Sequence, residues 1–123
     1  MNQCSYCIAQ SKGTPIIVEG HMMSKFFATR KVNGAYELTH VPSGFLVSKI
    51  KFPSLEEAEF FALFLESIDA KMWEVEIPKD VVVGLPDKLV ELLTYLNNLS
   101  AVKPLLQATD ISKIIDKWSR ANA

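Results

Sequence analysis

The stretch FPSLEEA, residues 52–58, divides this chain into two halves with different hydrophobic periods. Ser54 is typical of a helix N-cap, and Glu57, three residues later, completes a capping box. The acidic side chains of Glu56 and Glu57 also suit the positive end of a helix dipole. A long helix is therefore predicted from this point to about Asp69. Its apolar stripe comprises Ala58, Phe61, Ala62, Leu65 and Ile68.

Upstream of this signal, apolar and polar residues alternate, which predicts β-strands. Strands are expected at residues 16–18, 24–32, 35–41 and 45–52, and a further edge strand at residues 72–77. The Asn33-Gly34 pair predicts a tight hairpin turn, because both residues tolerate a positive φ. Residues 1–14 are polar and end in a turn signal, so we expect a flexible N-terminal segment there.

Downstream of the signal, the apolar residues recur at helical spacing. Pro86 is suited to a first helical turn, and Thr109 or Asp110 is a candidate cap for a last helix. Strands followed by helices indicate an α+β fold, in which an antiparallel sheet of about four to five strands packs against the long helix. The 123 residues fit a single domain at 15–123, with sheet and helix at 15–77 and a C-terminal helical pair at 78–123.

Composition narrows the class of protein. Hydrophobic residues make up 49% of the chain and charged residues 22%, values typical of a globular protein. No apolar run approaches the roughly 18 residues that span a bilayer, so no membrane association is expected. The N-terminus lacks a basic region followed by an apolar core, so we expect no signal peptide. With two cysteines and no export signal, a cytoplasmic location is expected.

The charges are unevenly distributed. Residues 1–53 hold six basic and two acidic side chains, a net charge of +4, whereas residues 54–123 have a net charge of −5. Cations neutralise phosphates and aromatic rings stack on bases, so a basic, aromatic sheet face indicates binding of nucleic acid, above all single-stranded. The alternative is a solvated strand, in which the lysines keep an exposed sheet edge from pairing with other chains and the phenylalanines lie in the core. The candidate binding residues are Lys25, Phe27, Lys31, Phe45, Lys49 and Lys51.

A second hypothesis is a protein-interaction or inhibitor module that acts through its helical surface. Phe60, Leu63 and Phe64 extend the apolar surface of the long helix almost all round, and surplus apolar surface marks partner sites. The C-terminal helices would cover these residues in one arrangement, and a second subunit, forming a homodimer, would cover them in another.

No catalytic signature is present, so we expect a protein that is not an enzyme and needs no cofactor. Cys4 and Cys7 have a spacing that can grip a metal, but only His21 and His40 could supply nitrogen ligands, and their spacing matches no compact zinc finger. Two ordinary thiols are the preferred interpretation. His40 is expected to be a hydrogen-bonded structural residue, because no motif ties a serine or cysteine nucleophile to it.

Four strands followed by a helix over residues 15–69, with a basic aromatic sheet, resemble the layout of the PC4-like and Whirly single-stranded DNA binders. That resemblance implies dimerisation through the helix and strand binding across the sheet. The stretches at residues 36–44 and 52–58 also look like those of small phage and mobile-element proteins.

Overall fold

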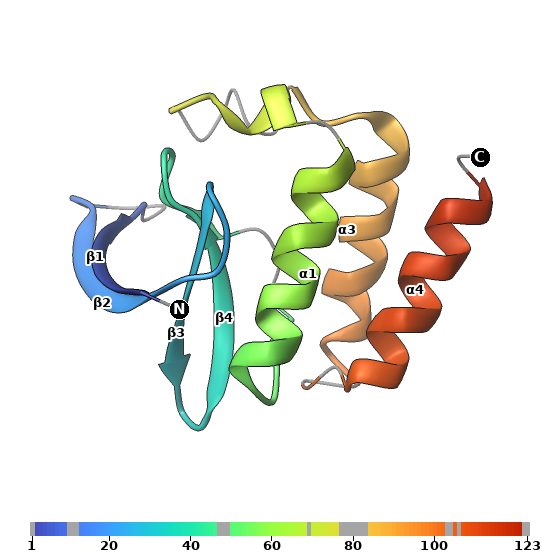
Figure 1. The fold of residues 1–123 in the computed structure, drawn as a ribbon, viewed down its shortest axis with the longest axis horizontal. Coiled ribbons are helices and arrows are strands. Elements are labelled where there is room, and N and C mark those ends of the chain that lie inside the picture. Colours follow the sequence, from blue (N-terminus) through green and yellow to red (C-terminus); the bar gives the residue numbers. More distant parts are fainter. Residues whose placement is uncertain are drawn as a thin grey trace.

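The computed structural model describes residues 2–9, 13–46, 50–68, 70–76, 84–102, 105 and 107–121. Five antiparallel strands in the N-terminal half are followed by helices, which confirms the α+β class (Figure 1). The strands are β1 (Asn2–Ile8), β2 (Ile16–Met22), β3 (Phe27–Val32), β4 (Ala35–His40) and β5 (Phe45–Leu46), and they neighbour one another in chain order. The helices are α1 (Leu55–Ile68), the short 3₁₀ helix η1 (Ala70–Trp73), α3 (Asp87–Leu99) and α4 (Ala108–Ala121).

The two strongest local signals are confirmed. The hairpin between β3 and β4 turns at Asn33 and Gly34, with φ angles of 52° and 82°. Helix α1 begins directly after Ser54, whose hydroxyl donates a hydrogen bond to the Glu57 carboxylate. Both signals act within a few residues of chain, so they hold whatever the rest of the fold does.

The predicted flexible segment at residues 1–14 is wrong for its first part, because Asn2–Ile8 forms β1 and pairs with β2 along its whole length. The strand alternates after all, since Tyr6 and Ile8 face the second core whereas Ser5 and Cys7 are exposed. The predicted strand at residues 72–77 is also wrong over residues 72–76, and residue 77 lies outside the described residues. Trp73 ends η1 instead, with its ring in the core, and the alternating burial of Trp73, Glu74 and Val75 reflects packing without strand pairing.

The predicted strand at residues 45–52 is present at its two ends within the described residues, where both ends pair with β4. β5 covers only Phe45 and Leu46, and residues 47–49 lie outside the described residues. Further along, Phe52 forms a single antiparallel bridge with Tyr36. The predicted strand at 24–32 likewise begins only at Phe27, because Ser24 and Phe26 form a turn held by the Glu66 carboxylate of α1.

The sheet curls because β2 follows β1 for seven residue pairs but β3 for only two. The β1–β2 hairpin therefore bends over the face of β3 and β4 that points away from the helices (Figure 1). Gly20 permits this close approach, since a Cβ there would lie 2.2 Å from the Thr29 carbonyl oxygen. The amide of Ala9 donates to the Gly44 carbonyl, which ties the end of β1 to the turn before β5.

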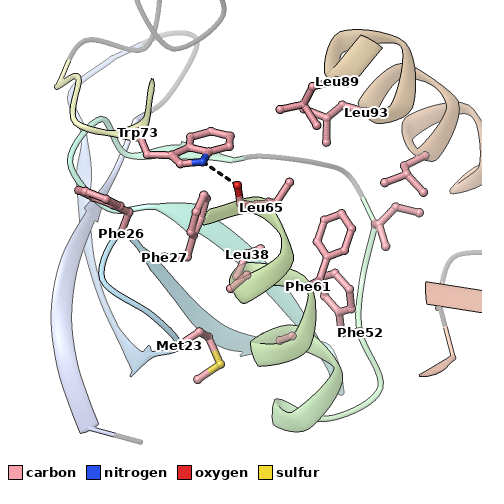
Figure 2. Packing of buried hydrophobic residues seen from close by; sticks show 14 residues of the cluster. Met23, Phe26, Phe27, Leu38, Phe52, Phe61, Leu65, Trp73, Leu89 and Leu93 are labelled. Carbon is pink, nitrogen blue, oxygen red and sulfur yellow. Dashed lines mark hydrogen bonds between the residues drawn. The ribbon is translucent and has the colours of Figure 1, made fainter. Parts of the chain in front are cut away.

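The main core fills the space between the other sheet face and the helices. Figure 2 shows Phe27, Leu38 and Trp73 beside α1, with Leu89 and Leu93 of α3 at the upper right. The Trp73 indole donates a hydrogen bond of 2.9 Å to the Leu65 carbonyl, so η1 is fixed to the end of α1. A second, smaller core lies under the curled hairpin and comprises Tyr6, Ile8 and Ala28 with Cys4, Val18, Met22 and Val41 around them.

Candidate functional site

The predicted nucleic-acid face is divided by the fold. Lys25 and Lys31 are exposed, with their ammonium groups 5.2 Å and 6.0 Å from the ring centroids of Phe26 and Tyr36. Lys25 lies in the turn that precedes β3, whereas Lys31 lies near the end of that strand, about 13 Å of extended chain beyond Phe27. Two cations this far apart do not by themselves form a continuous basic track.

The predicted base-stacking role of Phe27 is wrong, because this side chain is fully buried. Its ring lies 5.0 Å from the Trp73 ring and 5.6 Å from the His40 ring, centroid to centroid, on the face that the helices cover. Phe45 is half-buried and packs against the same core. Lys49 lies outside the described residues. The aromatic platform expected on the sheet is therefore not among the described residues at these positions.

Lys51 does not share a face with Phe27. Its ammonium group lies 3.0 Å from one oxygen of the buried Glu37 carboxylate, and the Arg30 Nε lies 2.6 Å from the other oxygen. Burial alone would raise the pKa of Glu37, but the hydrogen bonds from Arg30 and Lys51 outweigh it and hold that pKa below its usual range. Arg30 and Lys51, two of the cations in the basic half, are therefore paired internally with Glu37, and we call this set of three residues the Glu37 bridge.

Two hydroxyls lie buried near this bridge. The Tyr6 and Thr39 hydroxyls lie near each other, but neither makes a hydrogen bond of good geometry with any described residue. Burial, followed by the nearby negative charge of Glu37, raises the pKa of Tyr6 to about 12, so the phenol stays protonated. Sequence reasoning missed this polar interior, since it depends on β1 lying across β3 and β4.

His40 is a structural residue, as its surroundings in the sequence indicated. It is fully buried, with Nε2 2.6 Å from the Trp73 carbonyl oxygen and Nδ1 2.7 Å from the Ser43 hydroxyl. Because a carbonyl can only accept, Nε2 carries the proton and Nδ1 accepts from Ser43. The Ser43 oxygen also accepts from the amide of Phe45, so its hydrogen bonds are used in holding the turn.

The two cysteines do not form a metal pair. Cys4 and Cys7 lie three residues apart on β1, and side chains at that spacing point to opposite faces of a strand. Cys4 packs against the second core, whereas Cys7 is exposed. Within the part of the chain that the structure describes, no three side chains of the metal-ligating types come together.

The most distinctive open feature is an apolar groove between α1 and α4, with a volume of about 590 Å³. Phe60 and Leu63 remain 48% and 51% exposed on its α1 side, and Phe64 is half-buried beside them. Ile115 and Trp118 of α4 form the opposite wall. The structure therefore brings together all three predicted partner residues, and the apolar periodicity of residues 114–118 is the signal that could have identified the other wall.

A smaller depression of about 240 Å³ continues the groove toward the beginning of α1. Glu56, Glu57 and Ser112 line it, and Phe60 belongs to both hollows. Because Ser112 lies near the start of α1 and Ser119 near its end, α4 runs parallel to α1, as Figure 1 also shows. The groove thus has an acidic end, where both helices begin, and an apolar remainder.

Comparison of the chain with protein-family models, curated proteins and solved structures found no match. Among the helices in the described ranges, none has both the length and the apolar character needed to cross a bilayer.

Proposed function

We propose that this chain is a non-catalytic protein-interaction module that binds a polypeptide through the groove between α1 and α4. The observation that carries the proposal is the exposure of Phe60 and Leu63 at the edge of an apolar groove. Apolar side chains that are exposed singly are ordinary, but contiguous ones around a concave surface mark a partner site.

The shape of the groove favours a helical segment as the bound element. The residues of its α1 wall recur every three or four positions, from Phe60 to Ile68. That span covers about 12 Å, or roughly two helical turns, of the kind that an amphipathic helix fills with residues at matching spacing. Covering the exposed half of Phe60 and of Leu63 would contribute about 1 kcal/mol for each residue.

Site-specific photo-crosslinking tests this proposal. A benzophenone amino acid replaces Leu63 in the full chain, and the same amino acid replaces Tyr95 of α3, which is 56% exposed, as the matched control. After irradiation in the cells that produce the protein, position 63 should form polypeptide adducts that position 95 does not form. Equal adduct patterns at both positions would contradict the proposal, because they would show no preference for the groove.

Binding of single-stranded nucleic acid is our second proposal, supported by the exposure of Lys25 and Lys31 beside aromatic rings. It rests on fewer residues than the sequence indicated, since Phe27 is buried and Lys51 pairs with Glu37. A cytoplasmic location belongs with both proposals, because Cys4 and Cys7 are free thiols that suit a reducing compartment.

A further inference from the structure

The exposed side of α1 carries a regular stripe. Glu56, Phe60, Leu63 and Ser67 are its exposed residues, and they follow one another at intervals of four, three and four positions. This is the spacing of a coiled-coil seam, in which every side chain lies on one line along the helix. The stripe lies directly opposite the buried side of α1, formed by Ala58, Phe61, Ala62 and Leu65.

The stripe is self-complementary when read in opposite directions. A twofold axis midway between Phe60 and Leu63 places Phe60 against Leu63 of a second chain. The same axis places Glu56 against Ser67 of that chain, because both residue pairs are centred on the same point of the helix. We infer that the partner of this face is a second copy of the chain, whose α1 packs antiparallel to α1 of the first copy. This inference rests on the proposed interaction function.

Charge favours this arrangement over the parallel one. A parallel pair would stack Glu56 on its own copy, whereas the antiparallel pair sets each carboxylate opposite a hydroxyl. Antiparallel helices also bring opposite ends of their dipoles together. Because α4 runs parallel to α1, Arg120 in its last turn would approach the acidic end of the other copy, where Glu56 and Glu57 lie.

The groove supplies space for the ridge of the second helix. Its floor and far wall are built from Phe64, Ile115 and Trp118, and the rings of Phe64 and Trp118 meet edge to face with centroids 6.3 Å apart. Phe60 or Leu63 of a second copy would therefore meet apolar and aromatic surface. An isologous interface of this kind closes on itself and yields a dimer without further growth.

Sedimentation equilibrium over a wide concentration range tests the inference. The unmodified chain should dimerise, and Leu63→Asp should weaken dimerisation by roughly tenfold or more, since the charge would be buried twice in one interface. Tyr95→Asp, the matched control on α3, should leave it unchanged. Circular dichroism of Leu63→Asp should match that of the parent chain, and so should the urea midpoint at concentrations too low for dimerisation, because Leu63 is half exposed in the single subunit.

Disulfide trapping tests the direction of the helices. Glu56→Cys and Ser67→Cys are made separately in a chain in which both native cysteines are replaced by serine and whose fold has been verified. Mixing the two variants under mild oxidation should yield a covalent dimer, whereas neither variant alone should do so. Self-linking of Glu56→Cys would overturn the antiparallel arrangement.

A chain that stays monomeric at every concentration, or a dimer that Leu63→Asp leaves intact, would overturn the inference. The proposed interaction function would survive the first result if position 63 still formed crosslinks with other polypeptides. It would fail separately if position 63 formed no more adducts than position 95.

Discussion

Lowering the pH from about 7.5 to about 5.5 is expected to destabilise this protein through His40. Burial lowers the pKa of His40 from its ordinary value of 6.5, although the Trp73 carbonyl and the charge of Glu66 act in the opposite direction. Between the lowered pKa and 6.5, the unfolded chain binds a proton that the folded chain does not. Stability is therefore fully present above pH 6.5 and is lost as the pH falls.

The magnitude follows from the same linkage. Protonation of the unfolded chain at pH 5.5 lowers the free energy of unfolding by at most about 1.4 kcal/mol, the limit reached when His40 stays neutral in the fold. Protonating the buried ring instead would place a charge beside Phe27 and Trp73, whose rings lie 5.6 Å and 5.5 Å from it. Burying that charge is unfavourable because the two hydrogen-bond partners of the ring among the described residues, the Ser43 hydroxyl and the Trp73 carbonyl, are uncharged.

Urea unfolding at about half-unit pH steps measures the effect, and His40→Gln identifies its source. Glutamine can still donate to the Trp73 carbonyl but loses the bond from Ser43 and part of the ring packing, so it should cost about 2 kcal/mol near neutral pH. His40→Gln should also remove the decline in stability between pH 6.5 and 5.5. His21, the second histidine in the sequence, provides the matched control, since His21→Gln should retain the decline.

Two outcomes would refute the reasoning. One is an unfolding free energy that stays level from pH 7.5 to 5.5 in the unmodified chain. The other is a decline that persists in His40→Gln or disappears in His21→Gln, because the proton uptake would then belong to another group.

Three further predictions concern the sheet. Glu37→Gln should lower the free energy of unfolding by about 2 kcal/mol near neutral pH, since it weakens the hydrogen bonds to Arg30 and Lys51. The unmodified chain should lose stability as the pH falls below 4.5, because the pKa of Glu37 is lowered in the fold, and urea unfolding should show a smaller loss in the variant. Gly44→Ala should lower the free energy of unfolding by about 2 kcal/mol more than Gly34→Ala does. Both glycines have a positive φ, but only at Gly44 would a Cβ lie 2.7 Å from a backbone atom. Equal thermal midpoints of the two variants would contradict this. If the sheet binds single-stranded DNA, changing Lys25 and Lys31 to Glu should lower the affinity several-fold and reduce its salt dependence by about two counterions, measured by fluorescence anisotropy; no binding to the unmodified chain at low salt would end that proposal.

Of the residue sets that the sequence singled out, the apolar residues of α1 are the set that stays together on one open surface. Phe60, Leu63 and Phe64 were identifiable because they extend the apolar surface of α1 beyond the stripe that its own core needs. The residues proposed to bind nucleic acid do not stay together on one surface. Alternation places Phe27 on one side of its strand and Arg30 on the other, but it does not say which side the helices will cover. The fold buries Phe27 and directs Lys51 toward Glu37 on the opposite face.

The sequence alone determined the start of α1 at Ser54 and the β3–β4 turn at Asn33-Gly34, because each depends on interactions within a few residues. The order of strands before helices along the chain determined the α+β class. Tertiary structure alone decided that Asn2–Ile8 forms a strand, that Trp73 packs in the core instead of extending the sheet, and that α4 lies beside α1. These outcomes join segments that are far apart in the chain. Their free energy comes from burying apolar surface between such segments, which no local pattern contains.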